Sequence, residues 1–318
     1  MQDRLGPMEA GYYGLLQTIA DLLKLIQKEK IVPTSSIPSL FAIAPILIFM
    51  AVFLGFSVIP LNQTWAGSPL SLGLFFVLAV SSLDVVGIIV AGWASGNKYS
   101  TLGAIRSVAQ ILSYEVPLGL CVLAVALFNG SLDLQEISLK QNGVGPTFFL
   151  GVKWFDVTGM GGFLSWNIFQ MPILFVVWII FFICSLAESN RAPFDLPEAE
   201  SELVAGFQTE YSGFPWAIIM LAEYAMMLLT SMLGAVLFFG SWNSPLPGSL
   251  GSLTSGPTWG IFWLVLKTLS LVGIQIWVRW TFPRLRINQM LSLSWKYLTP
   301  VMLMIVFIIA LWKLILIR

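Results

Sequence analysis

The chain contains no histidine and only two cysteines, Cys121 and Cys184. Histidine is the commonest general base and metal ligand, so its absence excludes histidine-based catalytic triads, zinc sites and the usual haem ligation. Two cysteines inside apolar runs cannot supply the four thiolates that an iron–sulfur cluster usually needs. We therefore expect no metal or cofactor bound by this chain, and any redox centre has to lie in a partner.

Charge is also scarce, because 16 basic and 16 acidic residues make up only 10% of the 318 residues. A soluble domain usually carries about 25% charged residues. The net charge of zero argues against nucleic acid as a partner, and the sequence has neither a glycine-rich phosphate loop nor a dinucleotide fingerprint. With 57% apolar residues, the composition is that of a membrane protein.

Apolar stretches of about 20 residues are long enough to cross a bilayer as helices. The chain has candidate spans at 40–60, 70–93, 105–128, 166–187, 216–240, 259–282 and 298–317. Turn-forming residues separate them. We therefore predict an all-α, polytopic membrane protein with about seven transmembrane helices, forming a single membrane domain over 1–318. The opening residues are polar, so no secretory signal is expected before the first span.

Lysine and arginine are retained on the cytoplasmic side of membrane proteins. A cytoplasmic N-terminus puts eleven of them on that side and four on the other, while Lys267 falls within a span. The segments then predicted to be cytoplasmic are the N-terminus, 97–104, 188–215 and 283–296. The segments 129–165 and 241–258 are predicted to lie on the opposite side.

Residues 12–29 precede the first span and are predicted to form an amphipathic surface helix. Its apolar residues recur at helical spacing and are Leu15, Leu16, Ile19, Leu22, Leu23 and Ile26. The opposite face carries Gln17, Asp21, Lys24 and Lys28. A surface anchor and a functional role for individual residues both remain open at this point.

Charged residues inside the spans are the strongest functional signal from composition alone. Asp84, Glu115, Glu223 and Lys267 lie within predicted spans, and Glu188 lies at the end of another. An ionised side chain near the bilayer centre costs about 2.5–3.5 kcal/mol on insertion scales, so such groups usually face the protein interior and mark ion or proton paths. A structural pair of Lys267 with one carboxylate would account for a single acid. We therefore expect the four carboxylates to form a proton or ion path.

Proline in a helix leaves a backbone carbonyl without its usual partner. Pro117 does so within a run of polar residues that includes Gln110, Ser113, Tyr114 and Glu115. The sequence leaves two interpretations open, a hydrated niche beside Glu115 and a simple packing kink.

The segment 188–215 is the most charged part of the chain and is predicted to be an acidic cytoplasmic loop. It holds one arginine and six acids, which are Arg191, Glu188, Asp195, Glu198, Glu200, Glu202 and Glu210. Apolar residues interrupt the acids, namely Phe194, Leu196, Leu203, Phe207 and Tyr211. This alternation favours a folded loop packed under another subunit, with carboxylates lining a cavity, over a solvated loop.

The acidic loop also carries a resemblance to a known family. The run Pro193-Phe194-Asp195-Leu196-Pro197-Glu198-Ala199-Glu200-Ser201-Glu202-Leu203 resembles the signature of the H subunit family of NADH:quinone oxidoreductase, respiratory complex I, which includes mitochondrial subunit 1. Further similar segments are Gly14 to Gln17 with Asp21, Ser113 to Pro117, and Arg279 to Lys296. The resemblance covers essentially the whole chain.

The resemblance implies a translocase subunit that forms the membrane end of a quinone-binding chamber and links quinone reduction to proton translocation. The chamber and coupling loop would include Asp21, Arg191, Asp195, Glu198, Glu200, Glu202 and Glu210. The proton path would include Asp84, Glu115, Glu188 and Glu223.

The same resemblance implies the partners and the location. Quinone would be the substrate, while FMN and iron–sulfur clusters would lie in partner subunits. Those partners would be the soluble quinone-module subunits and the membrane-arm subunits of complex I, together with membrane lipid. The bacterial cytoplasmic membrane is expected as the location in preference to the mitochondrial inner membrane.

The chain departs from the family pattern in three places. The first membrane helix of the family is expected to be missing from this chain, Met8-Glu9 replaces an asparagine followed by a basic residue, and Asn288 stands where aspartate is more common. Two alternatives remain: the homologous subunit of a membrane-bound hydrogenase or formate hydrogenlyase, and a stand-alone ion transporter.

Overall fold

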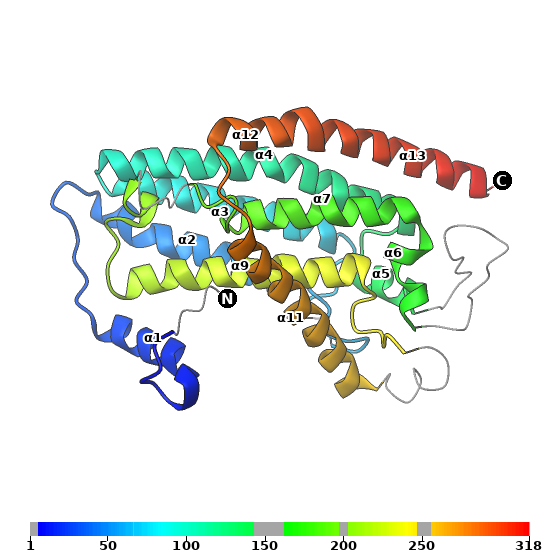
Figure 1. Ribbon diagram of the computed structural model, residues 1–318, viewed down its shortest axis with the longest axis horizontal. Helices are drawn as coiled ribbons and strands as arrows, with labels where there is room; N and C mark the ends of the chain where they lie inside the picture. The colour runs from blue at the N-terminus through cyan, green and yellow to red at the C-terminus, as the bar shows by residue number, and fades with distance from the viewer. Residues whose placement is uncertain (1–5, 66, 143–161, 197–202, 247–255, 318) are drawn as a thin grey trace.

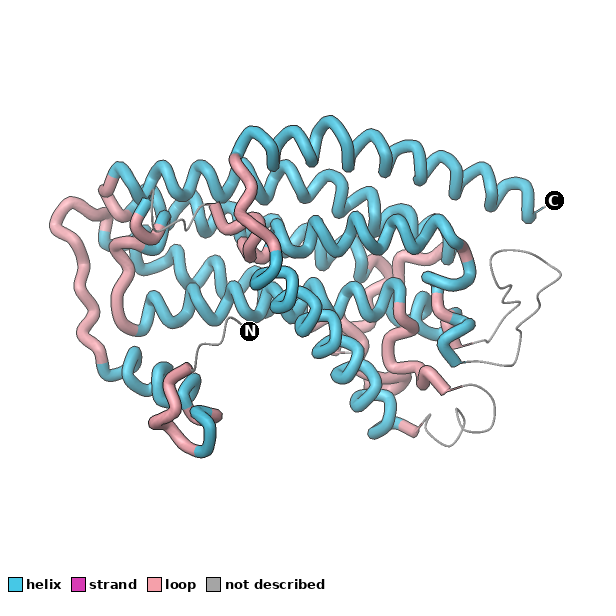
Figure 2. Tube along the Cα trace, viewed as in Figure 1, coloured by secondary structure: helices cyan, strands magenta, loops and turns pink. Residues whose placement is uncertain are grey.

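The computed structural model describes residues 6–65, 67–142, 162–196, 203–246 and 256–317. All regular elements of this described part are helical, and Figure 2 shows them as a bundle with loops gathered mainly at its two ends. The long helices are α2 (Pro38–Phe56), α3 (Gly73–Ala94), α4 (Lys98–Asn129), α7 (Pro172–Glu188), α9 (Phe214–Phe238), α11 (Pro257–Thr281) and α13 (Thr299–Ile317). The shorter ones are α1 (Gln17–Gln27), α5 (Leu134–Lys140), α6 (Asn167–Gln170) and α12 (Ile287–Ser292).

Within the described ranges, six helical stretches are long and apolar enough to cross a membrane, and α7, with 17 residues, is a shorter apolar helix. These are the seven predicted spans, so the prediction of a polytopic all-α membrane protein is confirmed. Four of the spans begin with a proline in the first turn, where its fixed φ suits the helix and its missing N–H has no intrahelical acceptor. These prolines are Pro38, Pro172, Pro215 and Pro257.

Three predicted boundaries were wrong. Helix α4 begins at Lys98, so most of the segment 97–104 is helical and not a loop, because Asn97 caps the helix by accepting from the Tyr99 N–H at 3.0 Å. The span predicted at 166–187 is divided into α6 and α7, with Met171 between them in extended conformation.

The third boundary concerns the surface helix predicted over 12–29. It consists of a 3₁₀ turn, Tyr12–Gly14, followed by α1. Gly14 breaks it, because its φ is +73° and a Cβ there would lie 2.2 Å from the Pro7 carbonyl oxygen. No residue of α1 is buried, and this helix lies at the edge of the bundle, where it contacts α9 (Figure 1).

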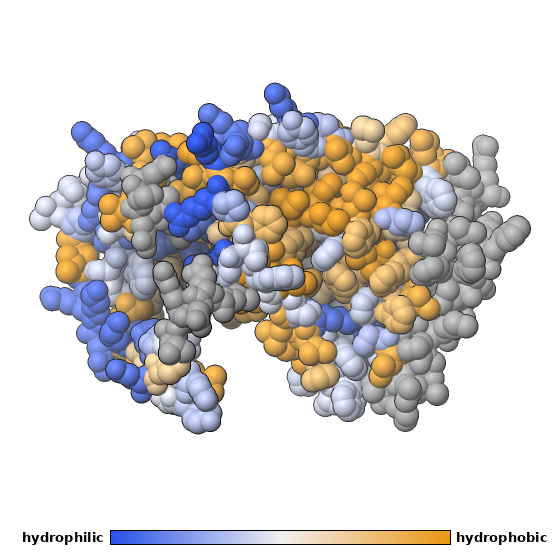
Figure 3. All heavy atoms as spheres, in the orientation of Figure 1, coloured by the Kyte–Doolittle hydropathy of each residue, from blue (hydrophilic) through white to orange (hydrophobic). Residues whose placement is uncertain are grey.

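The bundle is built around α4. This helix packs against α3, α7 and α13, while α2 lies against α3 and α9, and α11 crosses α9 obliquely (Figure 1). The largest fully buried side chains include Tyr114, Phe41, Phe207 and Phe238. Outward-facing side chains of α13 such as Met304 and Phe307 are exposed, and Figure 3 shows a broad apolar surface over this part of the molecule. Such a surface suits contact with lipid.

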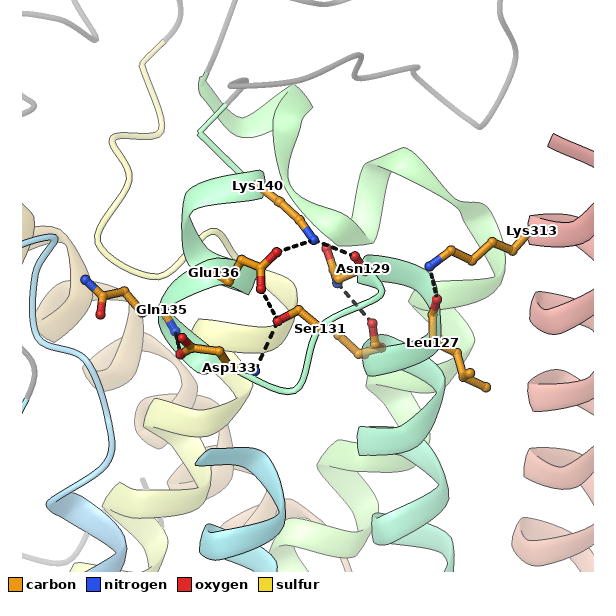
Figure 4. Close-up of polar contacts among 9 residues, drawn as sticks. Leu127, Asn129, Ser131, Asp133, Gln135, Glu136, Lys140 and Lys313 are labelled. Carbon is orange, nitrogen blue, oxygen red and sulfur yellow. Dashed lines mark hydrogen bonds and ion pairs between the residues drawn. The ribbon is translucent and has the colours of Figure 1, made fainter. Parts of the chain in front are cut away.

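The end of α4 shows how the bundle satisfies its free helix carbonyls (Figure 4). The Lys313 ammonium of α13 donates to the Leu127 carbonyl, and the Lys140 ammonium of α5 donates to the Asn129 carbonyl, each at 2.8 Å. Cations in this position are favourable because helix carbonyls there carry partial negative charge. Lys140 also pairs with Glu136 at 2.8 Å, and hydrogen bonds from Lys140 and Ser131 lower the pKa of the Glu136 carboxyl.

Candidate functional site

Three of the four predicted path acids border one small cavity. Asp84 from α3, Glu188 from the end of α7 and Glu223 from α9 line this acidic cavity together with Ser189 and Asn190. All three acids are buried. The cavity volume is about 10 Å³, close to the smallest space that holds one water molecule. Three carboxylates from three helices therefore share a site large enough for a single bridging water.

The carboxyl groups of this site differ in their partners. Glu223 accepts a hydrogen bond from the Gln208 side-chain amide at 2.5 Å. Glu188 interacts electrostatically with Glu115 and Asp84 and shares a hydrogen bond with the Ser81 hydroxyl. One oxygen of Asp84, Oδ1, is buried without a hydrogen-bond partner among the described residues. A buried oxygen of this kind needs a donor, which a water or a proton in the cavity would supply.

Glu115, on α4, does not line the acidic cavity. Its connection to the site is electrostatic, through Glu188. The nearby Pro117 leaves the carbonyl of Ser113 without a helical donor, and the Ser294 hydroxyl donates to that carbonyl. The Trp295 indole N–H also donates to the Ser113 hydroxyl at 3.2 Å. These contacts favour the packing interpretation of Pro117 over the hydrated niche.

A second cavity has a volume of about 220 Å³. We call it the arginine cavity, and its lining consists of Arg191, Tyr224, Met227, Gln275, Ile276 and Arg279. The Arg191 guanidinium is stacked over the Tyr224 ring at 4.2 Å from the centroid. Its Nε and one terminal nitrogen are buried without a hydrogen-bond partner among the described residues, as is Oε1 of Gln275. The cavity thus offers unpaired donors and an unpaired acceptor beside an aromatic ring.

The linings of the two cavities are adjacent along the chain. In the segment after α7, Glu188 to Asn190 line the acidic cavity, and the next residue, Arg191, lines the arginine cavity. On α9, Glu223 faces the first cavity and its neighbour Tyr224 faces the second. Arg191 and Tyr224 therefore link the lining of the arginine cavity to that of the acidic cavity along the backbone.

The remainder of the acidic loop is only partly described, and Glu198, Glu200 and Glu202 lie outside the described residues. Its apolar members Phe194, Leu196, Leu203, Phe207 and Tyr211 are all buried. Burial raises the pKa of the Tyr211 phenol, whose hydroxyl donates to the Phe41 carbonyl at 3.3 Å. These residues are therefore packed within the fold of the chain itself, while the packing of the loop under another subunit stays a prediction.

The other predicted site residues lie outside both cavities. Asp195 pairs with Arg284 at 3.2 Å, and Glu210 accepts from the Asn97 amide at 2.6 Å. Asp21 is exposed on α1, where Gln17 donates to it at 3.1 Å and Lys24 lies 3.9 Å away. In this structure Asp21 contacts its own helix and is not part of either cavity.

Lys267 has no carboxylate within ion-pairing distance in the part of the chain that the structure describes. Its ammonium instead donates to the backbone carbonyls of Ser241 and Asn243. The idea that Lys267 neutralises one of the intramembrane acids is therefore not supported, and all four acids remain for another role.

Sequence reasoning did not identify four residues of the site. Gln208 and Ser81 hydrogen-bond the acids, and Tyr224 and Gln275 line the arginine cavity. Gln275 offered a signal, since a glutamine inside an apolar span is costly. Gln208 offered none, because its contact with Glu223 depends on how the loop folds back onto α9.

The fold and these cavities define a class: a polytopic α-helical membrane protein that buries several carboxylates beside a partly polar cavity. Comparison with known proteins gives the family. The family model described as NADH dehydrogenase matches residues 1–310. The NADH-quinone oxidoreductase H subunit numbered 2 in Cytophaga hutchinsonii is 52% identical, over 98% of this chain and 91% of that protein.

Two further relatives are each named as the H subunit of NADH-quinone oxidoreductase. The protein of Chlorobium luteolum is 49% identical, over 98% of this chain and 81% of its own length. The protein of Polaromonas naphthalenivorans is 44% identical, over 98% and 82% respectively. The chain belongs to the NADH dehydrogenase family, as its acidic loop predicted.

Proposed function

We propose that the chain is the membrane subunit of a proton-translocating NADH-quinone oxidoreductase, in a bacterial cytoplasmic membrane. In this role it forms the membrane end of the quinone chamber and links quinone reduction to proton movement through buried carboxylates. The relatives are named as subunits of NADH-quinone oxidoreductase, which supports the assignment to this complex. The observation that carries the mechanism is the placement of Glu188 and Arg191 on the same short segment, one facing each cavity.

The arginine cavity is proposed to contribute to the chamber. Tyr224 and Met227 supply an apolar wall for a quinone ring, while Arg191 and Gln275 supply the few polar contacts typical of small-molecule sites. Asp195 and Glu210, with Glu198, Glu200 and Glu202, are proposed to form the coupling loop around it. Asp21 is assigned to the chamber on the resemblance of its segment.

Proton movement is proposed to run through Asp84, Glu188 and Glu223, with Glu115 as the next acid. A change of charge in the arginine cavity alters the electrostatic environment of Glu188, three positions before Arg191, and of Glu223, next to Tyr224. Low-dielectric surroundings strengthen such interactions, and carboxylates within them exchange protons with a bridging water. FMN and iron–sulfur clusters are proposed to lie in partner subunits, which deliver the electrons.

The test compares Glu188→Gln with Glu188→Asp in the fully assembled complex. Glutamine keeps the shape of the side chain but cannot gain and lose a proton, so we expect quinone reduction and proton translocation to fall at least tenfold. Aspartate should retain partial activity. Glu136→Gln is the matched control, because Glu136 is exposed and distant in the fold from the acidic cavity. Normal turnover and pumping in Glu188→Gln would refute the path.

A further inference from the structure

Lys267 is a buried cation that lines neither the acidic cavity nor the arginine cavity. It lies in α11, ten residues after Pro257, which is about 15 Å along the helix axis at 1.5 Å per residue. Its ammonium donates to the Asn243 carbonyl at 2.6 Å and to the Ser241 carbonyl at 2.9 Å. The face of Trp166 lies 4.5 Å away. Two carbonyl oxygens and an aromatic face all favour the charged form of the amine.

The backbone that Lys267 holds is irregular and buried. Helix α9 ends at Phe238, and Gly240 and Ser241 then take positive φ values of 73° and 47°. Ser241, Trp242, Asn243 and Ser244 are all buried. Irregular backbone at membrane depth is tolerated only where protein groups satisfy it or where it lines a hydrated cavity.

Side-chain amides hydrogen-bond the backbone at and around this turn. Gln141 accepts from the Gly240 N–H and donates to the Val236 carbonyl. Asn167 donates to the Leu237 carbonyl, and Asn243 donates to the Ser138 carbonyl. Amides of this kind cannot gain or lose a proton near neutral pH. We call this set, consisting of Gln141, Asn167, Asn243 and Lys267 with the backbone of 239–244, the amide plug.

The amide plug lies far from the acidic cavity. Glu223 and Phe238 are separated by 15 positions of α9, which corresponds to about 22 Å. Between them α9 buries apolar residues such as Met226, Leu229, Leu233 and Val236. Glu223 of the acidic cavity therefore lies about 22 Å along α9 from the end of this helix, where a neutral, hydrogen-bonded layer with the positive charge of Lys267 closes it.

We propose that the amide plug is a proton barrier, in which the positive charge of Lys267 repels protons that enter from the end of the bundle where α9 terminates. This inference rests on the proposed function, because a barrier is needed only in a chain that carries protons. A fixed cation excludes protons and other cations from membrane pores by the same physics. The acids of this chain then exchange protons with the opposite end of the bundle or with neighbouring subunits, and not through the plug.

The experiment measures passive proton entry into liposomes that contain the complete complex, without NADH or quinone, under an imposed potassium diffusion potential. Lys267→Gln removes the charge but keeps a donor for the two carbonyls. Its leak should rise on the order of tenfold, the effect of one unit charge acting over about 10 Å at an effective dielectric constant of about 20. Lys267→Arg keeps the charge and should leave the leak low. Lys140→Gln, a partly exposed lysine at the same end, is the matched control.

A second pair of variants, both at Ser241, tests the barrier with Lys267 unchanged, in case Lys267→Gln fails to assemble. Ser241 has a buried hydroxyl without a hydrogen-bond partner among the described residues and a left-handed φ that aspartate and asparagine tolerate. Ser241→Asp adds a negative charge beside the ammonium, whereas Ser241→Asn adds similar bulk without charge. The barrier requires a higher leak in the aspartate variant. Equal leaks in the two variants, or a wild-type leak in assembled Lys267→Gln, would overturn it.

Failure of the proton barrier and failure of the proposed function give different experimental results. NADH-driven quinone reduction in Lys267→Gln should stay close to wild type, while the number of protons retained per electron pair falls. A low leak in this variant combined with normal pumping refutes the barrier alone. The proposed path is refuted by normal pumping in Glu188→Gln, whatever the leak measurements show.

Discussion

Arg191 is the residue at which the packed loop and the membrane helices meet. It is the only base among the acids of its loop, yet no ion pair joins it to a carboxylate within the described ranges, and it stacks instead on Tyr224. A buried guanidinium that lacks carboxylate partners is costly unless something else compensates it. The stacking compensates part of that cost, and a polar ligand in the arginine cavity would compensate more.

Replacing Arg191 should therefore impair quinone reduction strongly. Arg191→Ala loses a desolvated cation–π contact worth about 2 kcal/mol, which corresponds to roughly a 30-fold loss of rate if the contact orders the substrate site. Arg191→Lys should be intermediate, because lysine keeps the charge but not the planar stack. The measurement is the NADH:quinone reductase rate per assembled complex.

Arg284→Ala serves as the comparison for this prediction. Arg284 is half exposed and pairs with Asp195, and such pairs contribute about 0–1 kcal/mol. We expect Arg284→Ala to retain most of the activity. An Arg191→Ala enzyme as active as Arg284→Ala would contradict the role given to Arg191.

Among the elements, the C-terminal ends of α4 and α9 are closed in different ways. The end of α4 is capped by lysines from α5 and α13, close to a partly exposed surface. The end of α9 is closed inside the protein by amides and by Lys267. Gly240 makes this second arrangement possible, because its φ is +73° and a Cβ would lie 2.4 Å from the Trp166 ring.

Gly240→Ala should consequently destabilise the plug. The left-handed conformation alone costs an alanine about 1–2 kcal/mol, and the Trp166 ring must also move away from Lys267. We expect a lower yield of assembled complex and faster thermal inactivation. Gly119→Ala is the control, since no atom lies within 4 Å of its Cβ position in α4 and alanine favours a helix by up to about 1 kcal/mol. Equal stability of the two variants would show that the turn after α9 is not strained by a side chain.

For the whole molecule, several segments predicted to lie on different sides of the membrane are at opposite ends of one bundle, while α12 lies midway along it (Figure 1). The N-terminal end of α4 and the segment before α9 lie at one end, while α5 and the C-terminal end of α9 lie at the other. The excess of lysine and arginine predicts that the first end is cytoplasmic. The amide plug would then face the opposite side of the membrane.

This orientation can be measured by cysteine labelling from each side of sealed vesicles. Lys98→Cys should react only from the cytoplasmic side, and Glu136→Cys only from the other side, since both positions are exposed at opposite ends of the bundle. The native Cys121 and Cys184 are fully buried and should not react. The reverse labelling pattern would show that the predicted topology is inverted and that the amide plug faces the cytoplasmic side.

The sequence by itself determined the class of the protein, its spans and its family. Membrane insertion depends on local length and hydropathy, so the positions of the spans follow from the chain without knowledge of contacts. The cost of charge in lipid likewise identified Asp84, Glu115, Glu188, Glu223 and Lys267 as residues that need an explanation. The acidic loop gave the family because its motif is contiguous.

Only the tertiary structure decided which of these residues lie together. Asp84, Glu188 and Glu223 are far apart in the chain and share a cavity because α3, α7 and α9 pack around it. Lys267 could have paired with an acid, but the fold of the segment after α9 brings two carbonyls to it instead. Asp21 belongs to a segment that resembles the H subunit family, and yet its side chain is exposed and contacts only its own helix. The hydropathy of a segment depends only on its own residues. The contacts of a buried side chain depend on packing between segments that are distant in the chain, and local sequence patterns do not specify that packing.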